Sequence, residues 1–135
     1  MWTAAASITT TAAPEAVWRL FEDVPGWKAW NAGIERIELQ GDFASGTRFL
    51  MQPPGMAPFT STLLDVRHGH GFTDETILDG TAIVVSHELQ ALPDGGTRIT
   101  YRTRASGPAA AEIGPLASAD FPAVLAALKA LAERA

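Results

Sequence analysis

The spacing of hydrophobic positions changes along the chain from strand-like to helical and back again. Residues 3–10 carry Thr and Ser around an Ile, with few breakers, which predicts a first strand. A helical spacing begins at Pro14, a residue suited to a first helical position, and ends at Pro25-Gly26. The next stretch, "GWKAWN", predicts one short helical turn with its two Trp residues on one side. The apolar stripe of the longer helix consists of Val17, Leu20, Phe21 and Val24.

From residue 34 onward the apolar positions alternate with a period of two, which is typical of strands. In "TRFLMQ" this alternation places Phe49 and Met51 on one face, and "IERIELQ" before it alternates likewise. Turn residues separate the later segments at hairpin spacing, so about seven strands are predicted, with sequential strands pairing antiparallel. The later strands are predicted at residues 59–66, 72–78, 81–92 and 97–107.

The chain closes with a helical pattern over residues 109–133, in which Pro122 predicts a bend. One strand, a pair of short helices, a run of strands and a long closing helix is the order of an α+β fold. We therefore expect one domain over residues 1–135, with a curved antiparallel sheet wrapped round the closing helix. The apolar stripe of that helix, which should cover the concave face of the sheet, is Phe121, Val124, Leu125, Leu128 and Leu131.

The composition narrows the classes of function. The chain has 135 residues, of which 47% are hydrophobic and 19% charged, the balance of a folded soluble domain. A formal net charge of −5 argues against binding to duplex nucleic acid or to an anionic membrane surface. The absence of cysteine excludes disulfides, thiolate metal sites and cysteine nucleophiles. The N-terminus lacks the basic region of a signal peptide, and Lys129 interrupts the most apolar segment, so we expect a cytoplasmic protein without an integral membrane segment.

The candidate chemistry lies in the hairpin over residues 84–107, "VVSHELQALPDGGTRITYRTRASG". A three-residue loop at Asp94-Gly95-Gly96, with Gly96 in the left-handed region, opposes Leu89 to Tyr101 and gives one continuous apolar face, whereas a two-residue turn would scatter that face. His87 and Tyr101 are then diagonal neighbours on the concave side of the sheet. Both side chains donate and accept hydrogen bonds, and His titrates near neutral pH, so they are candidates for ligand contact or proton transfer. The competing interpretation is that both residues belong to a packed core, where their polar atoms hydrogen-bond to backbone groups or water.

The same alternation assigns the residues that face the concave side, and they fit either the lining of a small-molecule pocket or a filled core. For each apolar side chain taken alone, core packing is the preferred interpretation. Val66 and Val124 are predicted to face this side too. The candidate ligand-binding residues are Trp30, Phe49, Met51, Leu64, Phe72, Val85, His87, Leu89, Ile99, Tyr101, Phe121, Leu125 and Leu128, of which only His87 and Tyr101 are candidate catalytic residues.

Two further patterns lead to no site. His68 and His70 in "RHGHG" would share a strand face, but a metal site needs a third ligand, and the flanking glycines indicate a turn. No metal and no cofactor are therefore expected. The adjacent acids Asp74-Glu75 have the pattern of ordinary exposed charges.

Three segments carry a resemblance that extends over nearly the whole chain: "TAAPEAVWRLFEDVPGWKAWNAGIERIEL", "HELQALPDGGTRITYRTRASG" and "FPAVLAALKALAERA". In order and spacing they resemble the START-like helix-grip (SRPBCC) superfamily, in particular its bacterial branch of polyketide cyclases and dehydrases. The resemblance implies a curved antiparallel sheet that grips a long C-terminal helix, two short helices that close one end, and an elongated cavity between sheet and helix. It also implies apolar or amphipathic ligands such as lipids, steroids, aromatic polyketides or quinones.

Two functions are compatible with this sequence, since a fold alone does not give function. The first is binding of a hydrophobic or aromatic small molecule, such as a lipid or polyketide, in the cavity for transport, sensing or sequestration. The second is a cofactor-independent cyclase or dehydratase, in which His87 shuttles a proton at an enolisable carbon and Tyr101 holds the developing enolate oxygen. Binding is favoured because the sequence pattern supplies no second acid or base at a fixed position. A protein-interaction domain of the co-chaperone type is a weaker alternative, and a monomer or homodimer is expected in each case.

Overall fold

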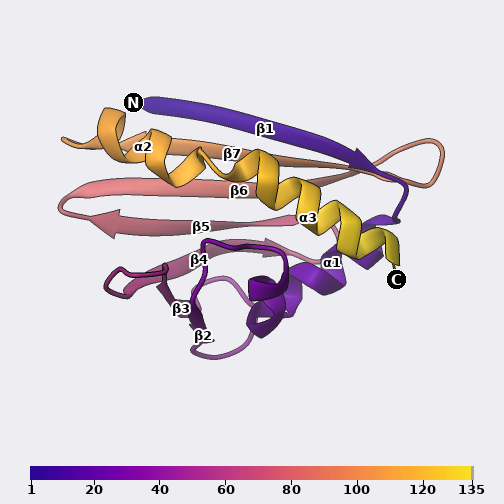
Figure 1. Cartoon of the computed structure of the whole chain (residues 1–135), viewed down its shortest axis with the longest axis horizontal. Helices are drawn as coiled ribbons and strands as arrows, with labels where there is room; N and C mark the ends of the chain where they lie inside the picture. The colour runs from indigo at the N-terminus through magenta and orange to yellow at the C-terminus, as the bar shows by residue number, and fades with distance from the viewer. Residues whose placement is uncertain (135) are drawn as a thin grey trace.

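The computed structural model describes residues 1–134. A strand and two short helices come first, six further strands follow, and two helices close the chain (Figure 1). The strands are β1 (Trp2–Thr10), β2 (Arg36–Leu39), β3 (Arg48–Gln52), β4 (Phe59–Arg67), β5 (Gly71–Leu78), β6 (Thr81–Ala91) and β7 (Thr97–Ser106). The helices are α1 (Pro14–Glu22), the 3-10 helix η1 (Val24–Ala29), α2 (Ala110–Ser118) and α3 (Phe121–Arg134).

All seven strands form one sheet in the order β1-β7-β6-β5-β4-β3-β2, and each neighbouring pair is antiparallel. The helices α2 and α3 lie across one face of this sheet (Figure 1). The helix α1 packs against α3, and η1 packs against β2. The predicted α+β class, with an antiparallel sheet, a closing helix and two short helices after the first strand, is thereby confirmed.

Pro122 breaks the closing helix into two rather than bending it. The helix α3 begins at Phe121, so Pro122 occupies the first turn, where its missing backbone N–H leaves no hydrogen bond unmade. By length and composition alone, the stretch from Ala110 to Arg134 is long and apolar enough to cross a membrane. However, Phe121 and Leu125 are buried in the same cluster as the sheet residues, as expected for a core helix.

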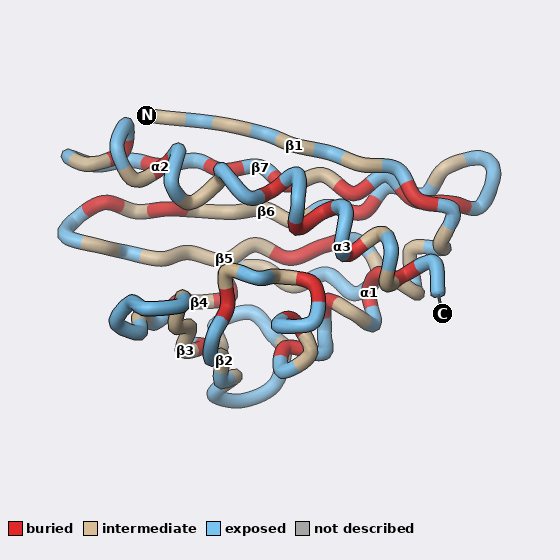
Figure 2. The backbone as a smooth tube through the Cα atoms, viewed as in Figure 1, coloured by how far each residue is buried: buried red, intermediate tan, exposed pale blue. Residues whose placement is uncertain are grey.

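The core is a cluster of aromatic rings between the concave face of the sheet, α1 and η1. Phe21 of α1 is fully buried and meets Phe72 of β5 with 5.1 Å between the ring centroids. Trp27 of η1 stacks on the same Phe72 at 5.5 Å and meets Phe49 of β3 at 5.7 Å. Figure 2 shows the matching buried stretches on the central strands and along α3. Aromatic contacts of this kind stabilise a core beyond the area that they bury.

One strand departs from strict alternation and overturns a prediction. A β-bulge between Leu63 and Asp65 shifts the pairing of β4 with β5. Leu63 is fully buried, whereas Leu64, which was predicted to face the concave side, is 45% exposed. The extra residue reverses the alternation beyond the bulge, so Val66 packs against the core as predicted.

The hairpin of β6 and β7 has the predicted faces but not the predicted register. His87 lies directly opposite Tyr101, so the two residues are not diagonal neighbours. Gly95, with φ of 91°, takes the left-handed position that was predicted for Gly96, and the Leu92 N–H donates to the Gly96 carbonyl. The register therefore differs from the predicted one by two residues. A shift by two leaves every side chain on its predicted face.

Gly71 joins the β4–β5 turn to β5, and its conformation suits only glycine. Its φ is 153°, and a Cβ atom there would lie 2.3 Å from the backbone oxygen of His87. We expect Gly71→Ala to lower the free energy of unfolding by about 2–4 kcal/mol, because relief of the clash would disturb the pairing of β5 with β6. Urea denaturation at neutral pH measures this change.

The matched control is Gly69→Ala in the same turn. Gly69 also has positive φ, at 76°, but a Cβ atom there would meet nothing within 4 Å. Its substitution should therefore cost only about 1–2 kcal/mol, for the left-handed backbone alone. Equal losses in the two variants would contradict the predicted clash at Gly71.

Candidate functional site

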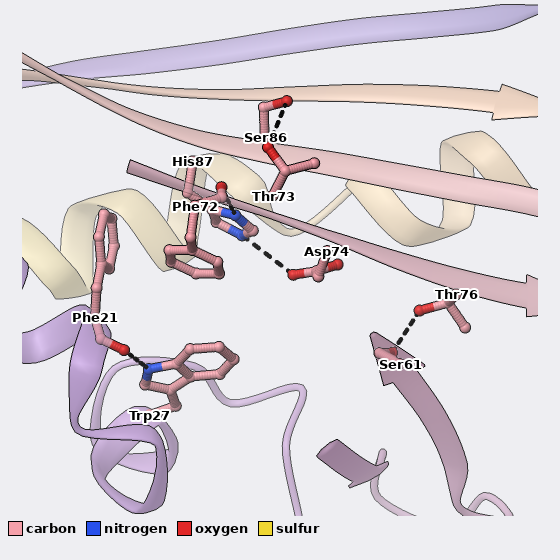
Figure 3. A network of polar contacts seen from close by, with 9 residues as sticks. All are labelled: Phe21, Trp27, Ser61, Phe72, Thr73, Asp74, Thr76, Ser86 and His87. Carbon is pink, nitrogen blue, oxygen red and sulfur yellow. Dashed lines mark hydrogen bonds and ion pairs between the residues drawn. The ribbon is translucent and has the colours of Figure 1, made fainter. Parts of the chain in front are cut away.

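Three neighbouring strands bring Asp74, His87 and Tyr101 onto the concave face of the sheet. His87 of β6 is paired with Phe72 of β5 on one side and with Tyr101 of β7 on the other. Because directly opposed residues point to the same face, the three rings lie in one row. Asp74 follows Phe72 by two residues, so its carboxylate points to this face as well (Figure 3). We call Asp74, His87 and Tyr101 the polar row.

The environment of His87 determines the tautomer of its imidazole. The ring stacks on Phe72, with 4.0 Å between the centroids and 10° between the planes. Its Nδ1 lies 3.2 Å from the Phe72 carbonyl oxygen, which can only accept, so Nδ1 carries the hydrogen and Nε2 is left as an acceptor. Burial lowers the pKa of His87 to about 3, although the hydrogen bond to Phe72 acts in the opposite direction. The imidazole is therefore neutral at physiological pH.

The carboxyl group of Asp74 lies opposite that acceptor. Its Oδ2 is 3.9 Å from His87 Nε2, and the two side chains are 14% and 11% exposed. Burial raises the pKa of Asp74 to about 7. No Lys or Arg forms an ion pair with this carboxylate among residues 1–134. Since burial disfavours both charged forms, Asp74 is mostly protonated below about pH 7 while His87 stays neutral.

The hydroxyl of Tyr101 is the most deeply buried group of the row. Tyr101 is 2% exposed, and its ring is held edge-on by His87 at 4.5 Å and by Phe121 at 5.3 Å. Within the described part of the chain the hydroxyl has no hydrogen-bond partner. Burial raises the pKa of Tyr101, and the negative charges of Asp74 and Asp120 raise it further. The phenol is therefore a hydrogen-bond donor throughout the physiological range.

Asp74 is the residue that the sequence analysis missed. Because Asp74 is adjacent to Glu75, both were predicted to be exposed charges. Glu75 does point away from the concave face, on the other side of β5. The signal that identifies Asp74 is its separation of two from Phe72, because Phe72 was predicted to be inward. The structure therefore supplies the second acid–base group that the sequence pattern did not reveal.

Most of the predicted lining residues are packed against one another. All of the following lie in one buried cluster and are at most 8% exposed: Trp30, Phe49, Phe72, Leu89, Ile99, Tyr101, Phe121, Leu125 and Leu128. Met51 and Val85 are partly buried at the edge of this cluster. Aromatic rings thus occupy the middle of the volume that was predicted to be an elongated cavity. Met51, Asp74, Val85 and His87 keep some exposure, as do other inward residues such as Val66 and Thr76.

Asp74 and Val85 lie directly opposite each other on β5 and β6, next to His87, whereas Met51 lies apart from them on β3. Val85 also packs against the small cluster that contains Ala110 of α2. We call Asp74, Val85 and His87 the concave strip.

The described residues form two surface hollows. One, of about 460 Å³, is lined by Asp65, Thr73, Ser86 and Glu88, and also by residues whose side chains point inward, Phe72, His87 and Leu89. Thr73 and Ser86 alternate with Phe72 and His87, so their side chains lie on the opposite, outer face of the sheet. The other hollow, of about 210 Å³, lies between η1 and α3. The lining of this second hollow is mainly apolar and includes Trp30, Val124 and Ala127.

The paired histidines of the β4–β5 turn are engaged elsewhere. His68 Nε2 lies 3.4 Å from Glu15 Oε2, and its ring meets Trp18 with 5.3 Å between the centroids. His70 is exposed in the same turn. Residues 1–134 contain no group of three side chains placed to hold a metal ion.

Comparison with solved structures yields relatives of the same fold at low sequence identity. Protein MLL2253 from Mesorhizobium loti is 18% identical with a TM-score of 0.82, over 98% of each chain. The di-domain ARO/CYC BexL from the BE-7585A biosynthetic pathway is 15% identical with a TM-score of 0.78, over 98% of this chain and 47% of BexL. A norcoclaurine synthase point mutant from Thalictrum flavum, in complex with a transition-state analogue, is 15% identical with a TM-score of 0.77, over 98% of this chain and 94% of the synthase. At these identities the likeness concerns the fold.

Sequence comparison gives the family. No curated protein sequence matches the chain. The family described as "Polyketide cyclase / dehydrase and lipid transport" matches residues 1–133, which confirms the resemblance seen in the sequence. The chain therefore belongs to the polyketide cyclase / dehydrase and lipid transport family.

Proposed function

We propose that this protein binds a hydrophobic, aromatic small molecule on the concave face, with the polar end of the ligand at the polar row. Membership of the family supports ligand binding or a cyclase role. The observation that carries the proposal is the Tyr101 hydroxyl, which is buried in an apolar cluster and has no hydrogen-bond partner within residues 1–134. A buried polar group without a partner is costly, and a ligand oxygen would relieve that cost.

The concave strip supplies the approach to the polar row. Val85 lies directly opposite Asp74, and both keep partial exposure. A ligand on this strip would therefore meet the apolar side chain of Val85, with the carboxyl of Asp74 and the imidazole of His87 beside it.

A second function, proton transfer on a ketonic substrate, is favoured by the pair of Asp74 and His87. The Nε2 lone pair of His87 would take a proton from a carbon next to the carbonyl, while the hydroxyls of Tyr101 and protonated Asp74 stabilise the enolate oxygen. In a dehydration, the proton of Asp74 would leave with the departing hydroxyl as water. Two solved relatives of the fold, the ARO/CYC BexL and norcoclaurine synthase, bear names of enzymes.

The binding function predicts opposite outcomes for two adjacent valines on β6. Val85 faces the concave strip, and Val84 faces the other side of the sheet. Nile red should bind the native protein saturably, and Val85→Lys should weaken that binding at least about tenfold, because a charge would replace apolar surface. Val84→Lys is the matched control and should leave binding within about twofold. Equal binding by both variants, measured by fluorescence titration, would place the apolar site elsewhere.

The proton-transfer function predicts exchange chemistry that depends on the polar row. Acetophenone deuterated on its methyl group should lose deuterium to water faster in the presence of the protein. His87→Gln and Asp74→Asn should each slow this exchange by about a hundredfold or more, while Nile red still binds. Exchange is followed by proton NMR, with Glu75→Gln as the control variant. Exchange at the same rate in His87→Gln would remove His87 from any catalytic role.

The opposed pKa shifts in the polar row predict a distinctive pH dependence of stability. Between its ordinary pKa of 3.8 and about 7, folded Asp74 holds a proton that the unfolded chain has released, so this group makes stability fall as pH rises. Between about 3 and 6.5, folded His87 lacks a proton that the unfolded chain holds, so this group makes stability rise. The two contributions, each about 1.4 kcal/mol per pH unit, cancel between about pH 4 and 6.5.

Single substitutions should reveal separately how Asp74 and His87 each make stability depend on pH. Relative to the native protein, the free energy of unfolding of Asp74→Asn should rise across that window, and that of His87→Gln should fall. Urea denaturation at a series of pH values measures both, and Glu75→Gln serves as the control. If Asp74→Asn runs parallel to the native profile, the carboxyl is not buried in its neutral form.

A further inference from the structure

Asp74 and His87 face each other without forming a hydrogen bond. The distance from Asp74 Oδ2 to His87 Nε2 is 3.9 Å, which is longer than a hydrogen bond (Figure 3). The two groups therefore do not satisfy each other. An oxygen atom offset from the line between them would lie within hydrogen-bond distance of both.

The chemistry of the two groups determines what that atom must be. His87 Nδ1 is committed to the Phe72 carbonyl, so Nε2 can only accept a hydrogen bond. Protonated Asp74 can donate one. A hydroxyl fits this pair, because it donates to the imidazole and accepts from the carboxyl. A ketone or ether oxygen can only accept, and it would leave Nε2 without a partner.

The charge around the site disfavours an anion. No Lys or Arg pairs with Asp74 within residues 1–134, and His87 is neutral. A carboxylate at the polar row would therefore be buried without a counter-ion. Fatty acids, which end in a carboxylate, are poorly matched to this environment.

We propose that the polar row selects a neutral phenol or enol, whose hydroxyl lies between Asp74 and His87 and whose ring lies against Val85, the residue directly opposite Asp74. This inference rests on the proposed binding function, since it names the chemical class that the same site takes. The hydroxyl of such a ligand would donate to His87 Nε2 and accept from Asp74. Tyr101 would supply a further donor to a second oxygen on the ring.

Three naphthalene derivatives of similar shape test this selection. They are β-naphthol, which donates and accepts; its methyl ether, which only accepts; and β-naphthoate, which is anionic. Displacement of Nile red at about pH 6, where Asp74 is mostly protonated, gives the three affinities. We expect β-naphthol to bind at least about tenfold more tightly than either of the others. Binding of β-naphthoate or of the ether as tight as that of β-naphthol would overturn the inference and leave the binding function intact.

Variants assign the preference to the polar row. Asp74→Leu and His87→Phe should each reduce the preference for β-naphthol over its ether to within about threefold, with displacement referred to the Nile red affinity of each variant. Glu75→Leu, on the opposite face of β5, should leave the preference unchanged. If Asp74→Leu does not fold, His87→Phe alone decides, because a phenyl ring can keep the stack on Phe72. A preference that survives His87→Phe would overturn the inference. Failure of Nile red and of all three derivatives to bind the native protein would instead overturn the binding function.

Discussion

Phe72 cannot be buried at the centre of the aromatic cluster without turning Asp74 to the same side of the sheet. Side chains two residues apart on a strand share a face, and the contacts of Phe72 with Phe21 and Trp27 determine which face that is. The carboxyl is therefore carried into apolar surroundings by its neighbour's packing. Its raised pKa follows from that position, because burial is the cause of the shift.

The packing around Phe72 also determines the orientation of the His87 side chain. The stack on Phe72 and the hydrogen bond to its carbonyl hold the imidazole in one orientation and one tautomer. A neutral base and a neutral acid then face each other at a distance that leaves both able to bind a third atom. Buried polar groups of this kind reduce stability, and the surrounding cluster of rings offsets that loss. Such groups are often found at functional sites.

Ligand binding and proton transfer would both use the three side chains of the polar row. The fold alone therefore does not distinguish between the two functions. Either function needs an apolar strip beside a donor and an acceptor held at fixed positions. A binding protein uses them to orient a ligand, and an enzyme would also move the proton that Asp74 holds. Whether the protein binds or catalyses would depend on the reactivity of the ligand. A phenol is a stable aromatic compound and would only be bound, whereas a ketone can lose a proton to form an enolate.

The sequence by itself determined the elements and most of the faces. Strand and helix periodicity are local properties, and they sufficed for the α+β order and for the inward positions of Phe72, His87 and Tyr101. The tertiary structure decided what depends on contacts between distant segments. The bulge in β4 turned Leu64 outward, the loop conformation at Gly95 placed His87 directly opposite Tyr101, and aromatic rings from α1 and η1 filled the middle of the predicted cavity. Burial of Asp74 belongs to this second group, because the dielectric environment of a carboxyl depends on what the fold packs around it.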